Sequence, residues 1–202
     1  METFLFALGG YLIGSIPVAY LLARKRHGID LRREGSRNIG ARNAFEVTGN
    51  KRIGFAVLVL DMHKGIIPLA ILNGLGYCDA IPVAAVTIVL GHCYPVWLKF
   101  HGGRGLATGG AIMLLISPVI LLAWIVLYGL AGILRSQVHL QALAATLGCF
   151  FFELIAGGDL LSGKARIVCT GSHSHETILV ILAIVLSRHI EPVYTLLRKA
   201  KA

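Results

Sequence analysis

Long apolar runs separated by polar stretches constrain this sequence more than any other feature. A helix needs about 20 apolar residues to cross the hydrocarbon core of a bilayer. Because backbone polar groups find no water there, apolar runs of this length fold as helices. We therefore predict an all-α integral membrane protein with a single polytopic domain over residues 1–202. The runs cover residues 4–22, 53–75, 81–98, 106–134, 140–156 and 177–186.

The charged residues lie between the apolar runs. The formal net charge is +9, and nine lysine and arginine residues fall between positions 24 and 52. In a soluble domain this balance would suggest nucleic-acid binding. Here it matches the basic loops that membrane proteins keep on the cytoplasmic side. We expect no nucleic-acid partner, and we expect an uncleaved first helix because no basic residue precedes it.

Pro118, in the middle of the run at 106–134, decides the number of segments. If Pro118 marks a turn, the chain has about seven membrane segments, with the N-terminus outside and the C-terminus inside. Nearly all basic loops then share one side. If Pro118 only kinks one helix, the basic tail changes side and the charge bias weakens. The charge distribution favours seven segments.

The four cysteines form no CxxC pair, so the sequence indicates neither a zinc site nor a redox motif. Cys78 and Cys169 are expected in loops on the outer side and could form a disulfide there. His173 and His175 form an HxH pair on the same side. No third ligand is near them in the sequence, and we expect no metal.

Three polar segments are expected on the cytoplasmic side, and the first is the glycine-rich and amide-rich stretch GSRNIGARN at 35–43. Glycine lets backbone N–H groups turn toward an anion, serine and asparagine donate hydrogen bonds, and arginine makes planar contacts to phosphate. The stretch is equally consistent with a solvated loop that touches lipid head groups. Its candidate binding residues are Gly35, Ser36, Arg37, Asn38, Gly40, Arg42 and Asn43.

The second segment, GHCYPVWLKFHGGRGLAT at 91–108, carries a glycine turn directly before an apolar helix. A helix N-terminus offers unbonded N–H groups and the positive end of the helix dipole, which favour phosphate or an oxyanion. Taken alone, the turn is as consistent with a plain connection between helices. Its candidate residues are His92, Gly102, Gly103, Arg104 and Gly105.

The third segment is RHIE, expected at the end of the last helix, where His189 and the nearby Glu191 could orient a substrate hydroxyl. A basic helix end is also ordinary at a membrane surface. Asp61 and Lys64 are three residues apart on the second predicted helix and can form an ion pair. Because charges at membrane depth are unfavourable, we expect a structural pair that supports the site.

The order and spacing of these segments resemble the PlsY-type acyl-phosphate:glycerol-3-phosphate acyltransferases over nearly the whole chain. The combination is GSRNIGARN, DMHKG at 61–65, GHCYP with its GGRG turn, and RHIE. The resemblance implies a seven-helix membrane enzyme that moves an acyl chain from acyl phosphate to the sn-1 hydroxyl of glycerol 3-phosphate. The product would be lysophosphatidic acid, used in phospholipid synthesis. The resemblance implies a protein surrounded by lipid in a bacterial inner membrane. It implies neither a metal nor an organic cofactor.

Several positions depart from the family pattern. Arg37 or Arg42 could replace a basic residue that is lost at Glu46, or Arg42 could pair with Glu46 four residues later. Arginine for lysine at position 104 keeps the charge but changes the shape of the group. The replaced positions are Arg37, Arg42, Glu46, Arg104, the serine-rich turn that reads VHLQA up to Ala142, and Pro192.

From these residues we predict direct acyl transfer with no covalent enzyme intermediate, at a site facing the cytoplasm. Arg104, Arg42 and the glycine N–H groups would hold the donor phosphate and stabilise oxyanion charge. Ser36, Asn38 and His189 would position glycerol 3-phosphate, and His189 or a substrate phosphate oxygen would take the proton. The alternatives are a paralogue with another acyl donor or acceptor, and a non-catalytic transporter or lipid-binding protein.

Overall fold

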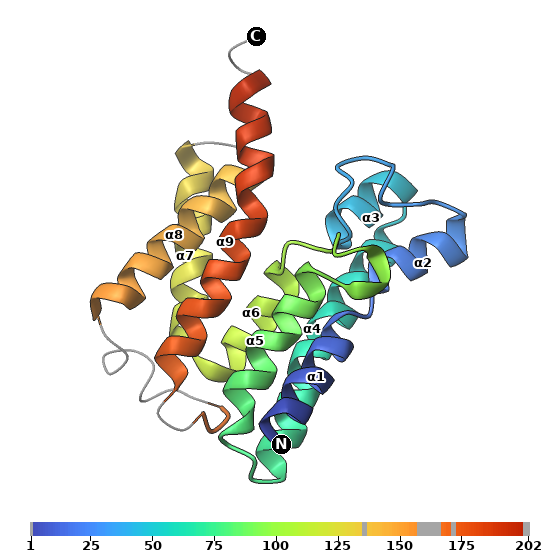
Figure 1. Ribbon diagram of the computed structural model, residues 1–202. Helices are drawn as coiled ribbons and strands as arrows, with labels where there is room; N and C mark the ends of the chain where they lie inside the picture. Colours follow the sequence, from blue (N-terminus) through green and yellow to red (C-terminus); the bar gives the residue numbers. More distant parts are fainter. Residues whose placement is uncertain (1, 135–136, 157–166, 171–172, 200–202) are drawn as a thin grey trace.

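The computed structural model describes residues 2–134, 137–156, 167–170 and 173–199, and over these residues the chain is helical with no strand. This confirms the predicted all-α class. In Figure 1 the chain starts at one end of an elongated bundle and the last helix extends beyond the other end. The helices are α1 (Glu2–Gly14), α2 (Val18–His27), α3 (Ala41–Thr48), α4 (Lys51–Gly74), α5 (Ala80–Cys93), the 3-10 turn η1 (Val96–Leu98), α6 (Leu106–Ile116), α7 (Pro118–Leu134), α8 (Val138–Ala156) and α9 (Ser174–Lys199).

The described helices are apolar enough for a membrane protein. Five stretches, at 2–27, 51–74, 80–98, 138–155 and 174–194, are long enough to cross a bilayer. The helices α6 and α7 are also apolar but shorter. Together these stretches and short helices match the predicted segments one for one, while the number of crossings and their orientation remain predictions.

The run at 106–134 forms two helices that meet at a turn. The helix α6 ends one residue before Ser117, and α7 begins one residue after it. Gly110 of α6 lies against Leu121 of α7, which requires the chain to reverse direction between them. Pro118 therefore starts a new helix after a turn, as the charge distribution favoured, and does not kink a continuous one.

Two other segments differ from the boundaries expected from hydropathy. The first apolar run is broken at 15–17, because Pro17 has no N–H with which to continue α1. Figure 1 shows α2 turning away from the axis of α1 after this break. The last helix continues to Lys199, although the apolar run stops near Leu186. His189 consequently lies within a helix and not at its end.

Glycines bring α1 and α5 into close contact. A Cβ on Gly14 would lie 2.1 Å from the carbonyl oxygen of Ile88, and a Cβ on Gly91 would lie 2.2 Å from that of Tyr11. Only glycine fits at such distances, and small residues commonly mediate helix packing in lipid, where burial of apolar surface adds little. The helix α5 also contacts α4, α6 and α9, so it is central to the bundle.

A disulfide between Cys78 and Cys169 lies at the end of the bundle away from α2 and α3, with the two Cα atoms 5.1 Å apart. It joins the turn between α4 and α5 to the stretch that precedes α9. The backbone N–H of Cys169 also donates to the side-chain oxygen of Asn73, at 2.9 Å. The pairing that the sequence left open is thus present in the structure.

The Asp61–Lys64 pair lies inside the bundle on α4. Lys64 Nζ lies 3.0 Å from Asp61 Oδ1 and donates to the carbonyl oxygen of Ile16 at 3.2 Å. The Lys64 and Asp61 side chains are 7% and 3% exposed. Since Ile16 belongs to the break between α1 and α2, the pair ties α4 to the point where the first apolar run bends.

We expect Lys64→Met to destabilise the protein by about 3–5 kcal/mol, because Asp61 would remain as a buried carboxylate without its partner. The double variant Asp61→Asn, Lys64→Met should regain most of that loss, since no buried charge is left. Thermal unfolding of the three proteins in one detergent measures both effects. A single variant that melts with the wild type would show that the pair contributes nothing to stability.

Candidate functional site

One buried amide, that of Asn43 on α3, shapes the loop that precedes this helix. Its Nδ2 donates to the carbonyl oxygens of Asn38 at 2.9 Å and Glu34 at 3.2 Å, and its Oδ1 accepts from the backbone N–H of Ser36 at 2.9 Å. Both ends of the amide are therefore used within the protein. We predicted Asn43 as a substrate ligand; in the structure its amide holds the loop through these hydrogen bonds.

The glycines of this loop have the same structural task. Gly35 has a φ of +58°, and a Cβ on it would lie 2.3 Å from Asn43 Oδ1. Gly40 precedes α3 in an extended conformation. Neither glycine lines the pocket described below, whereas Ser36, Arg37 and Asn38 do.

The second predicted segment is a turn over residues 102–105 that packs against the end of α5. The N–H of Gly102 donates to the carbonyl oxygen of Cys93 at 3.1 Å, and that of Gly103 to the carbonyl oxygen of His92 at 3.0 Å. Both amides, which we predicted as anion ligands, are thus engaged by carbonyl oxygens of the protein in this structure. The remaining main-chain contribution to an anion site comes from the N-terminus of α6, which follows Gly105 (φ +81°).

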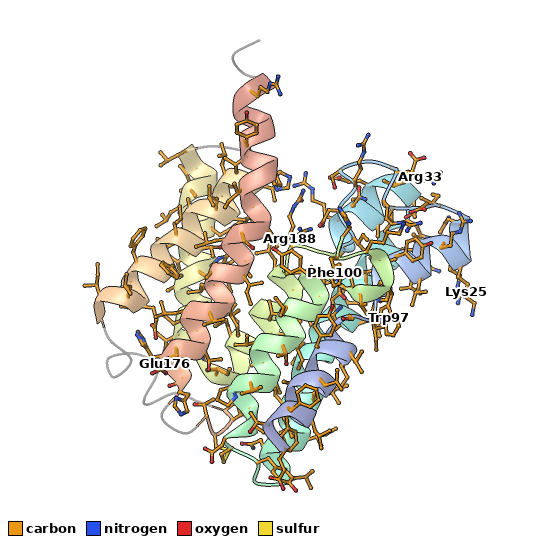
Figure 2. All side chains as sticks on the ribbon, viewed as in Figure 1. Lys25, Arg33, Trp97, Phe100, Glu176 and Arg188 are labelled. Carbon is orange, nitrogen blue, oxygen red and sulfur yellow. A yellow bond between two sulfur atoms is a disulfide. The ribbon has the colours of Figure 1, made fainter. Side chains whose placement is uncertain are left out.

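Arg188 on α9 fastens the same turn from the other side. Its guanidinium donates to the carbonyl oxygens of Gly103 at 3.2 Å and Gly102 at 3.3 Å. It also lies over the ring of Tyr94, 5.0 Å from the centroid. Figure 2 shows Arg188 on the side of α9 that faces this loop. The position of the turn thus depends on α5 and α9 together.

His92 supports the turn from behind and does not line the pocket. A Cβ on Gly103 would lie 2.1 Å from His92 Nε2, so the ring and the turn are in direct contact. His92 Nδ1 lies 3.7 Å from Asp61 Oδ1. The ion pair of α4 therefore reaches the turn through one buried imidazole, which fits the supporting role expected for Asp61 and Lys64.

The loop at 36–38 and the turn at 102–104 face each other across one polar pocket of about 630 Å³. Figure 2 shows nitrogen-bearing side chains gathered between α9 and α3. None of the described residues that line this pocket is acidic, and a cleft with such an excess of positive charge attracts anions. The lysine and arginine side chains in its lining are Arg32, Arg37, Lys99, Arg104 and Arg188.

Two arginines near this end form salt bridges with carboxylates. Arg32 makes two hydrogen bonds to Asp30, at 2.9 and 2.7 Å, and lies 4.9 Å from the ring centroid of Tyr20. The hydrogen bond from Arg32 lowers the pKa of Asp30 to about 2, so this carboxylate is charged at neutral pH. Arg42 pairs with Glu46 at 2.7 Å and does not line the pocket. The i, i+4 pairing considered from the sequence is thus present, and Arg42 is not among the pocket cations.

Two histidines lie beside Arg104. Its Nη1 is 3.5 Å from Nε2 of His139 on α8, and the rings of His139 and His189 have centroids 6.5 Å apart. The Nδ1 of the fully buried His189 lies 2.8 Å from the carbonyl oxygen of Val185. Because a carbonyl only accepts, the neutral ring carries its hydrogen on Nδ1, and Nε2 is an acceptor with no hydrogen-bond partner among the described residues. The side chain of Glu191 lies outside the described residues.

The sequence analysis missed several residues of the pocket, of which His139 is the most informative. It belongs to the segment that we noted only as a replaced serine-rich turn. Of the described non-glycine residues, Arg37, Lys99 and Phe100 have φ between +53° and +62°. All three lie in the loops that border the pocket. Such conformations gather at functional sites, but nothing in the sequence pattern indicates them.

The family model for glycerol-3-phosphate acyltransferase matches residues 4–199. The chain belongs to this family. A glycerol-3-phosphate acyltransferase from Campylobacter jejuni subsp. doylei is 31% identical over an alignment that covers 98% of this chain and 97% of the relative. One from Anaeromyxobacter sp. is 41% identical over 74% of this chain and 75% of the relative. Glycerol-3-phosphate acyltransferase 5 of Dehalococcoides mccartyi is 46% identical over the matched part. That part spans about half of the relative's length, 49%.

Two crystal structures of PlsY, described as an integral membrane glycerol 3-phosphate acyltransferase, have the same fold as this family member. The glycerol 3-phosphate form superposes with a TM-score of 0.79 at 29% identity and covers 98% of this chain and 94% of that one. The lysophosphatidic acid form gives a TM-score of 0.77 at 28% identity, covering 98% and 93%.

We expect Gly103→Ala to destabilise the protein by about 1–3 kcal/mol, the usual effect of overpacking, because its Cβ would meet the imidazole of His92. In a His92→Ala background the same change should have almost no effect. Gly129→Ala is the control, since nothing lies within 4 Å of a Cβ there. Thermal unfolding measures all four. An equal loss with and without the imidazole would exclude the contact as the cause.

Proposed function

We propose that this protein transfers an acyl chain from an acyl phosphate to the sn-1 hydroxyl of glycerol 3-phosphate, giving lysophosphatidic acid for phospholipid synthesis. The observation that carries the proposal is the pocket with five lysine and arginine side chains and no acidic residue in its described lining. Both substrates bear phosphate groups, which arginine binds through charge-assisted hydrogen bonds. The related PlsY structures, a glycerol 3-phosphate form and a lysophosphatidic acid form, support this pair of acceptor and product.

Arg104 is our candidate ligand for the donor phosphate. Its guanidinium can make two parallel hydrogen bonds to a phosphate, and the N-terminus of α6 immediately after it adds the positive end of the helix dipole. In the transfer, the glycerol oxygen bonds to the carbonyl carbon while the bond from that carbon to the phosphate oxygen breaks. Negative charge develops on the carbonyl oxygen, and the same donors would stabilise it.

The loop at 36–38 is our candidate for the acceptor side. Ser36 and Asn38 offer hydrogen-bonding groups at the pocket wall, and Arg37 offers a cation for the glycerol phosphate. The hydroxyl proton would go to an oxygen of the donor phosphate, because His189, the other acceptor expected from the sequence, is fully buried and does not line the pocket. The phosphate leaves as inorganic phosphate, and no covalent enzyme intermediate is formed. Holding the hydroxyl near the carbonyl supplies much of the rate acceleration.

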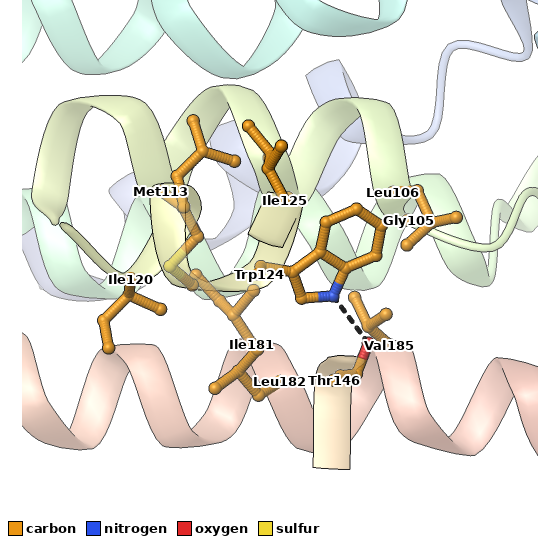
Figure 3. A pocket seen from close by; sticks show the side chains of 13 residues that line it. Gly105, Leu106, Met113, Ile120, Trp124, Ile125, Thr146, Ile181, Leu182 and Val185 are labelled. Carbon is orange, nitrogen blue, oxygen red and sulfur yellow. Dashed lines mark hydrogen bonds between the residues drawn. The ribbon is translucent and has the colours of Figure 1, made fainter. Parts of the chain in front are cut away.

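An apolar chamber behind the polar pocket is our candidate site for the acyl chain. It has a volume of about 110 Å³ and begins at Gly105, the residue after Arg104. Figure 3 shows its lining of side chains from α6, α7 and α9, with Trp124 reaching across to Thr146 of α8. Part of an acyl chain fits this space. Ile125 at its edge is 54% exposed, so the rest of the chain can extend into the bilayer.

The chamber offers little to bind water. Its described lining holds one hydroxyl, that of Thr146, which already accepts from Nε1 of Trp124 at 2.9 Å and donates its hydrogen to the carbonyl oxygen of Ala142 at 2.6 Å. Apolar cavities of this kind stay dry and accept apolar ligands. A hydrocarbon chain is therefore a better occupant than solvent.

We further propose that the pocket faces the cytoplasm of a bacterial cell, from the inner membrane. The basic stretch between residues 24 and 52 lies at the same end of the bundle as the pocket, in agreement with the positive-inside rule. The disulfide lies at the other end, and disulfides persist in oxidising compartments such as the periplasm.

Purified protein should convert palmitoyl phosphate and labelled glycerol 3-phosphate into lysophosphatidic acid and inorganic phosphate in equal amounts. We expect Arg104→Ala to lower kcat/KM by about 100-fold or more, because it removes a donor to the developing charge. Lys25→Ala, on the exposed side of α2 (Figure 2), should leave the rate unchanged. If the wild type forms no product beside an active control enzyme, this substrate pair is rejected.

The role of the chamber can be tested with Gly109→Leu. A Cβ on Gly109 would make only ordinary contacts, 3.7 Å from Ile181 and Val185, so the backbone tolerates a side chain that then fills the space. We expect KM for palmitoyl phosphate to rise about tenfold, a change of about 1.4 kcal/mol, with KM for glycerol 3-phosphate unchanged. Gly129→Leu adds the same bulk at an exposed position of α7 and should leave both KM values unchanged. Equal KM values in both variants would exclude the chamber as the acyl site.

A further inference from the structure

His139 enters the polar pocket from α8, an element that carries none of the motifs that first marked the site. It is the second residue of this helix and lines the pocket together with Arg104. Its Nε2 lies 3.5 Å from Nη1 of Arg104. The contact joins residues 35 positions apart in the sequence.

The chemistry of the two groups fixes the state of the ring. A guanidinium has five N–H donors and no acceptor, so His139 Nε2 has to accept. The ring is therefore neutral and carries its hydrogen on Nδ1. A protonated ring would place a further positive charge against Arg104 in a pocket that already holds five lysine and arginine side chains. A neutral imidazole thus gives this pocket a hydrogen-bond acceptor and leaves its positive charge unchanged, whereas a carboxylate would lower that charge.

We propose that His139 is a positioning residue for Arg104, and that the two side chains bind the donor phosphate as one unit. A guanidinium recognises phosphate through a planar fork, so its orientation matters as much as its charge. A hydrogen bond at Nη1 holds that plane, and a guanidinium carries N–H groups on all three of its nitrogens with which it can bind a phosphate. The inference rests on the proposed function for the identity of the ligand, but the pairing itself concerns any phosphate group bound at Arg104.

The test compares His139→Ala, His139→Gln and His139→Leu in the wild-type and Arg104→Ala backgrounds. Glutamine can accept from Arg104 near the position of Nε2, and leucine fills the space without an acceptor. We expect His139→Ala and His139→Leu to lower kcat/KM for palmitoyl phosphate about tenfold, with KM for glycerol 3-phosphate unchanged. His139→Gln should recover most of the activity. In the Arg104→Ala background all three changes should be nearly without effect, as expected for coupled residues.

His101 provides the matched control. It also lines the pocket, but its Nδ1 lies 2.7 Å from the carbonyl oxygen of Lys99 and not beside Arg104. His101→Ala should therefore change the rate by the same factor in both backgrounds. Melting temperatures of all variants, measured in the same detergent, identify any that fail to fold.

Binding of inorganic phosphate gives a second readout that needs no turnover. Calorimetry on the same variants should show phosphate affinity about tenfold weaker in His139→Leu than in His139→Gln. If the wild type binds phosphate with this pattern but forms no lysophosphatidic acid, the proposed function fails and the pairing stands. If His139→Gln loses as much as His139→Leu in folded protein, or if His139→Ala has the same effect with and without Arg104, the pairing is rejected.

Discussion

The buried contact between Asp61 and Lys64 is the interaction on which the arrangement of the site depends. Lys64 also holds the carbonyl oxygen of Ile16, where the first apolar run bends and α2 turns away. The Asp61 carboxylate lies 3.7 Å from His92, whose ring backs the glycine turn at 102–105. A charged pair in a membrane protein is tolerated only where partners surround it. Here those partners are Ile16, at the break between α1 and α2, and His92, which backs the glycine turn, so the pair links that break to one wall of the pocket.

Five lysine and arginine side chains line the pocket, and no acidic side chain in its described lining neutralises them. The arginines that line it are held in different ways: Arg188 by carbonyl oxygens of the glycine turn, and Arg104 by a neutral imidazole. Among the contacts described for these side chains, a carboxylate, that of Asp30, holds Arg32. Carbonyls and neutral rings orient a guanidinium without cancelling its charge. This choice of partners leaves most of the positive charge for the phosphate groups that we propose as ligands.

The sequence predicted most of the fold because apolar runs and charge bias are local signals. It also predicted the Asp61–Lys64 pair, since a spacing of three residues on a helix brings side chains together. It did not predict contacts with backbone groups, such as those that the amide of Asn43 makes inside its own loop. It also did not predict contacts between residues distant in the chain, such as that of His139 with Arg104, between which α6 and α7 lie. Hydropathy also predicted that the last helix ends near Leu186, whereas α9 continues to Lys199. Hydropathy marks where a segment is apolar, and a helix can continue beyond that point.

The polar pocket and the apolar chamber meet at the Arg104–Gly105 peptide unit, and this junction suits a donor that is itself half polar and half apolar. An acyl phosphate with its phosphate at Arg104 and its chain beyond Gly105 would have its carbonyl at the boundary between the two spaces. Charge that develops there is next to hydrocarbon, where a low dielectric strengthens the interaction with fixed donors. The water-soluble acceptor would reach the same carbonyl from the loop at 36–38. A membrane protein can thus join a lipid-soluble and a water-soluble substrate without moving either far from its own phase.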